Sequence, residues 1–199
     1  MIHSFNFSIF IVSTIVILLT PGPTNTLLAA SGMEYGMRGV QSMLACELSG
    51  YLLAISSWGF ILTPLQHRFS WLAILVRVAC SVYLAVLAAK MWRSAEPSSA
   101  QGRRTISSQV LFFSTLVNPK GLLFASAVFP ADAFDIFSVY LTAMGLFSLL
   151  LVPIGLMWTW FGAAFANKRI AQLNRIKLQR AIAVTIGLFS MTIVWTAFH

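Results

Sequence analysis

Runs of apolar residues, each long enough to form a helix across a bilayer, follow one another along most of the chain. A hydrocarbon core about 30 Å thick needs about 20 mainly apolar residues per helix. Stretches such as FSIFIVSTIVILL, at 7–19, do not alternate between polar and apolar positions as the strands of a membrane barrel do. Six windows are long enough, and we expect each to be a transmembrane helix: 5–28, 39–65, 71–89, 106–130, 136–166 and 181–198.

The composition gives the same result for the chain as a whole. Of its 199 residues 58% are hydrophobic and only 9% are charged, against about 25% charged residues in an ordinary soluble protein. We therefore expect an all-α, polytopic membrane protein with one integral-membrane domain over 1–199. The first window lacks the basic start and the small-residue cleavage site of a secretory signal, so we expect it to be retained.

Lys and Arg are distributed unevenly between the connections, and connections rich in them face the cytoplasm. One side holds ten of them, whereas the other holds Arg68 beside Asp132 and Asp135. This asymmetry predicts that both termini lie outside the cytoplasm, and six spans satisfy that parity. Topology and contact with anionic lipid account for the net charge of +8 without nucleic acid. The ten Lys and Arg residues on the basic side are Arg38, Lys90, Arg93, Arg103, Arg104, Lys168, Arg169, Arg175, Lys177 and Arg180.

We also expect a linker at 94–104 and an amphipathic interfacial helix at 167–180.

Proline interrupts the first window in the sequence TPGPTN and the fourth window in VNPKG. Proline lacks a backbone donor and clashes with the preceding turn, so the carbonyls that it frees must be covered by protein or by water. We expect Thr20 to cap a helical segment that begins at Pro21, and Asn118 to cap one that begins at Pro119. The alternative is that both prolines only kink their helices.

The two breaks open two sets of three spans, and because three is odd the two sets have opposite orientations in the bilayer. We therefore expect a 3+3 inverted repeat, with halves near 1–93 and 105–199. Interrupted helices at matching positions of two such halves indicate the substrate site of a transporter. The expected substrate-binding residues are Thr20, Pro21, Gly22, Pro23, Thr24 and Asn25 in the first break and Asn118, Pro119 and Lys120 in the second.

Three ionisable side chains fall inside the expected spans, namely Glu47, Arg77 and Lys120. At the bilayer centre Asp, Lys or Arg costs about 2.5 to 3.5 kcal/mol on insertion scales, so such residues are candidates for function. Arg77 is near the end of its span and can extend outward, which leaves its role open between structure and function. Glu47 is the one carboxylate inside a span. We expect it to couple protons or to bind a substrate ammonium group, the alternative being a structural ion pair with Lys120.

Four segments resemble the lysine-exporter and homoserine-lactone efflux (LysE/RhtB) family of amino-acid exporters. They are LTPGPTN at 19–25, ASGMEYGMRGV at 30–40, YLAVLAAKMW at 83–92 and LVNPKGLLF at 116–124. The resemblance implies proton-driven export of amino acids or close derivatives across the bacterial inner membrane. Many members of that family have Asp or Asn directly after TPGP, where this chain has Thr24 followed by Asn25. The missing carboxylate favours a neutral or zwitterionic substrate over a cationic one.

Other functions have less support in the sequence. The histidines, His3, His67 and His199, lie at the termini and in a connection, and no zinc-protease or Ser-His-Asp motif is present, so we expect no enzyme, metal or cofactor. Export of another small metabolite and a channel-like permease remain open as alternative functions. The sequence also leaves open whether the protein forms a homo-oligomer. A purely structural protein has no need for buried charge beside two matched helix breaks.

Overall fold

The computed structural model describes residues 7–93, 107–130 and 132–166, together with six isolated residues of the last window at 184, 187, 188, 190, 191 and 195. The expected linker, the expected interfacial helix and most of the sixth window lie outside the described residues. Within the described ranges the chain is helical and has no strand. The elements in order are α1 (Phe7–Leu19), α2 (Pro23–Tyr35), α3 (Val40–Arg68), α4 (Ser70–Arg93), α5 (Ser108–Leu116), α6 (Pro119–Leu123), the π-helical turn η1 (Phe124–Val128) and α7 (Phe137–Ala166).

The helices agree with the first five apolar windows. Two stretches, Val40–Arg68 and Phe137–Ala164, are each long and apolar enough to cross a membrane. The first and fourth windows are bent pairs, with 57° between α1 and α2 and 43° between α5 and the helical stretch Pro119–Val128. Both expected helix breaks are therefore confirmed. Counting each bent pair as one span, the described residues contain up to four candidate spans; six spans and an inverted repeat remain predictions.

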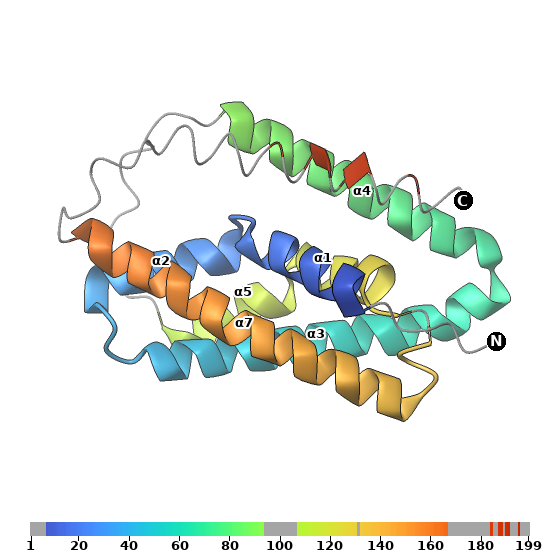
Figure 1. Cartoon of the computed structure of the whole chain (residues 1–199), viewed down its shortest axis with the longest axis horizontal. Helices are drawn as coiled ribbons and strands as arrows, with labels where there is room; N and C mark the ends of the chain where they lie inside the picture. The colour runs from blue at the N-terminus through green and yellow to red at the C-terminus, as the bar shows by residue number, and fades with distance from the viewer. Residues whose placement is uncertain are drawn as a thin grey trace.

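Helix α2 packs along α7 at very short range, and the two ribbons run side by side in Figure 1. Glycines allow this approach from both sides. A Cβ at Gly32 on α2 would overlap the backbone of Thr159, and a Cβ at Gly162 on α7 would overlap the backbone of Ala29. Small residues that let two backbones meet are typical of helix packing in membranes. This contact holds the restarted half of the first window against α7.

Two clusters of buried apolar side chains form the interior. The larger one includes Phe124 and Phe147, whose rings meet edge to face at 4.9 Å. The smaller one consists of Leu28, Met43, Leu44 and Leu111, with Trp158 packed against it. Many other large apolar side chains are exposed on the outside, as expected for a surface in contact with lipid.

The helix ends adjoining the basic segments lie toward one end of the molecule. Figure 1 shows the α2–α3 connection and the C-terminal ends of α4 and α7 on that side. At the opposite end, His67 Nε2 of α3 lies 3.6 Å from Asp135 Oδ2, which precedes α7. This arrangement fits the grouping of Lys and Arg expected from the sequence. Which end faces the cytoplasm remains a prediction.

Candidate functional site

The first break differs in one respect from the expected geometry. Helix α1 ends at Leu19 and α2 begins at Pro23, so Thr20 and Pro21 lie in the break itself. The prediction that Thr20 caps a helix starting at Pro21 is wrong. Its hydroxyl donates to Val16 O at 2.8 Å, which completes the last turn of α1 instead. Gly22 is the N-cap of α2 and has no side chain to occupy the first N–H groups of that helix.

The second break has the expected geometry. Helix α5 ends at Leu116 and α6 begins at Pro119. The Asn118 side chain caps α6 by accepting a hydrogen bond from Lys120 N at 3.1 Å. Proline suits the first position of a helix because that residue needs no N–H partner. The N-terminus of α6 is therefore capped by a side chain, whereas that of α2 is not.

The two breaks meet at the carbonyl of Thr20. The ammonium group of Lys120, on α6, donates to Thr20 O at 2.6 Å. Asn25 Nδ2 donates to the same oxygen at 2.8 Å and to Leu18 O at 2.7 Å. These bonds satisfy carbonyls that the break releases, which hydrocarbon cannot do. A Cβ at Gly22 would lie 3.2 Å from Lys120 Cε and 3.3 Å from its Nζ, so glycine leaves the room that Lys120 occupies.

Glu47 lies on α3 beside both breaks and is 2% exposed. Its carboxyl interacts with the Thr24 side chain and with the charge of Lys120. The ammonium group of Lys120 and the carboxylate of Glu47 are too far apart for a salt bridge. Within the described ranges, the pair close enough to form one is His67 and Asp135. Glu47 Oε2 is buried and has no hydrogen-bond partner among the residues that the structure describes, and a Cβ at Gly155 of α7 would lie 3.0 Å from it. A buried carboxylate oxygen that no donor reaches is costly, and such a group calls for a ligand or a proton.

Tyr51 also belongs to this site, although it is not among the site residues expected from the sequence. Its hydroxyl lies 3.3 Å from Thr24 Oγ1 of the first break and accepts from Asn118 Nδ2 of the second at 3.2 Å. Its ring packs edge to face against Phe124 and Phe147. Tyr51 is one helical turn beyond Glu47, and this spacing of four residues inside an apolar window is the signal that was available.

The structure thus brings together most of the expected site residues. Thr20, Thr24, Asn25, Asn118, Lys120 and Glu47 are all buried, and contacts among their atoms connect the two breaks. Arg77 is half-buried on α4. The arrangement offers a buried cation, a buried carboxylate oxygen without a donor and an uncapped helix N-terminus. Such a set can bind opposite charges on one small molecule.

Comparison with known proteins supports the resemblance noted in the sequence. No solved structure matches the chain. The family model described as LysE type translocator matches residues 15–196, which include both helix breaks and Glu47. Membership in this family implies a multi-pass membrane protein that exports amino acids or other metabolites rather than an enzyme. Because the match covers nearly the whole chain, the chain belongs to the LysE type translocator family.

Proposed function

We propose that this protein is a secondary exporter of small neutral or zwitterionic amino acids, or of their derivatives, driven by the proton gradient across the bacterial inner membrane. The observation that carries the proposal is the contact between the two breaks, in which Lys120 Nζ donates to Thr20 O. It brings a buried cation to the point where two helices are interrupted, beside the carboxylate of Glu47. Such convergence at interrupted helices is typical of transporter substrate sites.

The substrate carboxylate is assigned to the N-terminus of α2 and to Lys120. Helix N-termini carry unpaired N–H groups and a partial positive charge, both of which favour anions. At α6 the Asn118 side chain occupies Lys120 N, whereas the N-cap of α2, Gly22, has no such side chain. The Lys120 ammonium has three donors, and its bond to Thr20 O uses one of them.

The substrate ammonium group is assigned to Glu47. Its Oε2 atom has no donor among the described residues, so it can accept a bond from the ammonium group. The same carboxyl can instead take a proton, which removes its charge while it is buried. Because one carboxyl cannot hold both at once, a proton and a substrate compete for Glu47. That competition exchanges protons for substrate across the membrane.

Two substitutions test the assignments in proteoliposomes. Lys120→Met keeps the length of the side chain and removes its cation, so we expect export to be abolished while the protein still inserts. Glu47→Gln keeps shape and hydrogen bonding but cannot titrate. We expect it to exchange substrate for substrate and yet not to respond to an imposed pH gradient. Asp135→Asn, at an exposed carboxylate in the connection before α7, is the matched control and should behave as wild type.

The substrate is identified first by growth protection against a panel of toxic amino-acid analogues on overexpression. Wild-type export by Lys120→Met would remove the carboxylate site from the proposal. An unchanged response of Glu47→Gln to the pH gradient would remove its role in coupling. Overexpression that protects against no analogue, in cells where the protein is inserted, would contradict amino-acid export itself.

A further inference from the structure

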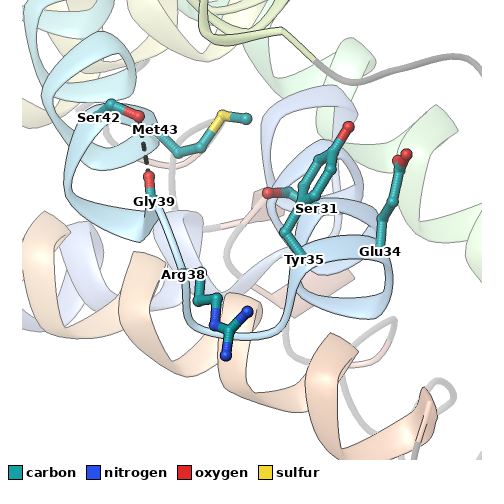
Figure 2. A pocket seen from close by; sticks show the side chains of 7 residues that line it. All are labelled: Ser31, Glu34, Tyr35, Arg38, Gly39, Ser42 and Met43. Carbon is teal, nitrogen blue, oxygen red and sulfur yellow. Dashed lines mark hydrogen bonds between the residues drawn. The ribbon is translucent and has the colours of Figure 1, made fainter.

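A pocket of about 490 Å³ lies where α2 ends and α3 begins. Figure 2 shows side chains of the last turns of α2 opposite those of the first turn of α3, with Arg38 on the connection between them. Its rim carries both signs of charge, because Glu34 and Arg38 are exposed there. Ser31 and Ser42 add hydroxyls, and the Ser42 hydroxyl donates to Gly39 O at 2.9 Å. The pocket is thus polar at its rim and suits a molecule that carries both charges.

The pocket lies on the face of α3 that carries Glu47 and on the face of α2 that carries Thr24, whose side chain interacts with Glu47. On α3, Met43 lines the pocket and Glu47 follows it by four residues, which is one helical turn. On α2, Ser31 lines the pocket and Thr24 lies seven residues before it, which is two turns. Because residues one turn apart share a face, a line along both helices leads from the pocket to the carboxylate.

A thin apolar layer interrupts that line. Leu28 lies between Ser31 and Thr24 on α2, and Met43 and Leu44 lie before Glu47 on α3. Leu28 and Leu44 side chains both border the space at Gly155 that Glu47 Oε2 also borders. The layer is therefore about one side chain thick in each helix. Trp158 packs against it, and its Nε1 is buried with no hydrogen-bond partner among the described residues.

We infer that the pocket is the cytoplasmic mouth of the substrate path and that Leu28, Met43 and Leu44 form the gate between this mouth and Glu47. The inference rests on the proposed function and adds the route and the gate to it. Two polar atoms that have no hydrogen-bond partner in the described part of the chain lie on the far side of the layer and beside it, Glu47 Oε2 and Trp158 Nε1. A layer that only filled the core would need neither. In this structure the gate is closed.

The connection between α2 and α3 allows the gate to open. Gly36 and Gly39 have positive φ angles of 64° and 72°, and a Cβ at either position would meet nothing within 4 Å. The connection therefore lies in open space at both glycines, so no packed neighbour at these two positions opposes a movement of the first turn of α3. Met43 is unbranched, and methionine adapts its shape readily to a changing environment. A zwitterion fits this path because charges of both signs mark its mouth and Glu47 and Lys120 lie at its inner end.

Thiol labelling in membrane vesicles tests the gate without requiring transport. The native thiols are first removed by Cys46→Ala and Cys80→Ala. A membrane-impermeant methanethiosulfonate is then added to inside-out vesicles carrying one reporter, either Ser42→Cys in the mouth or Thr24→Cys behind the gate. We expect fast labelling of the first reporter and slow labelling of the second. Met43→Ala should then speed labelling at position 24 by about tenfold or more, as the loss of an apolar contact of about 1.4 kcal/mol would.

Matched controls separate a gate from general loosening. Met144→Ala removes a methionine of the same 7% exposure from the other apolar cluster, and should leave labelling at position 24 unchanged. Met43→Leu keeps the volume and should keep the slow rate. Equal rates at position 24 in Met43→Ala and in the unsubstituted gate would overturn the inference, as would labelling of Ser42→Cys only from the opposite side of the membrane. Gated labelling without export of any amino acid would support the gate and contradict the proposed substrate class, whereas export with ungated labelling would contradict the gate alone.

Discussion

Removing the Tyr51 hydroxyl is a test of whether the two helix breaks act as one site. Tyr51→Phe deletes a single oxygen and leaves the ring between Phe124 and Phe147, at centroid distances of 6.0 Å and 5.7 Å. The lost contacts are those to Thr24 Oγ1 at 3.3 Å and from Asn118 Nδ2 at 3.2 Å. The substitution therefore removes the Tyr51 link between the breaks, leaves the bond from Lys120 to Thr20 O in place, and does not disturb apolar packing.

The magnitude follows from the geometry of these two contacts. The contact from Asn118 lies at the long end of the range for N–H···O bonds, and the contact with Thr24 is longer than a usual O–H···O bond. Neutral hydrogen bonds contribute about 0.5 to 1.5 kcal/mol each, and about 0.6 kcal/mol on average between membrane helices. We expect Tyr51→Phe to lower the free energy of unfolding by about 1 to 2 kcal/mol in total. If the hydroxyl aligns the site, the apparent kcat/KM for export should fall by a factor of about 5 to 30.

Tyr140→Phe is the matched control. The Tyr140 hydroxyl bonds to Ser56 Oγ at 2.8 Å, which joins α7 to α3 away from both breaks. We expect a similar loss of thermal stability in detergent and wild-type export. The two variants are compared by thermal unfolding and by uptake into inside-out vesicles at matched expression. Equal transport by Tyr51→Phe and Tyr140→Phe would refute the reasoning, since loss of the hydroxyl at the breaks would then have no functional effect.

Two further predictions concern helix packing and the breaks themselves. Gly162→Ala should destabilise the protein by about 1 to 3 kcal/mol because its Cβ would overlap the backbone of α2, whereas Gly145→Ala, where a Cβ meets nothing within 4 Å, should be neutral or slightly stabilising; equal melting temperatures would contradict the close contact of α2 and α7. The triple variant Pro21→Ala, Pro23→Ala, Pro119→Ala supplies the three missing backbone donors, each worth about 0.5 to 1.5 kcal/mol, and lets the helices continue. We expect normal insertion with export lost in a vesicle assay, and wild-type export would show that the breaks are only kinks.

Some features of the site are local and follow from the sequence. Proline has no backbone N–H to donate within a helix, so both breaks were predictable at TPGPTN and VNPKG. The cap at Asn118 was predictable as well, because a short polar side chain followed by proline is a common start of a helix. Thr20 shows the limit of this logic. Its hydroxyl had two local choices, and it bonds back to Val16 O rather than forward, which moves the start of α2 to Pro23.

The sequence by itself determined the apolar helices, the place of both breaks and the presence of a cation and a carboxylate within the spans, because each depends on residues close together in the chain. Tertiary structure decided what those groups meet. Lys120 reaches the carbonyl of Thr20, one hundred residues away, and Glu47 lies beside Gly155 of α7. Tyr51 connects the two breaks only because α3 packs against both of them. Contacts of this kind depend on how closely the helices approach one another. Small residues on helices far apart in the sequence set that distance, so no local sequence pattern predicts it.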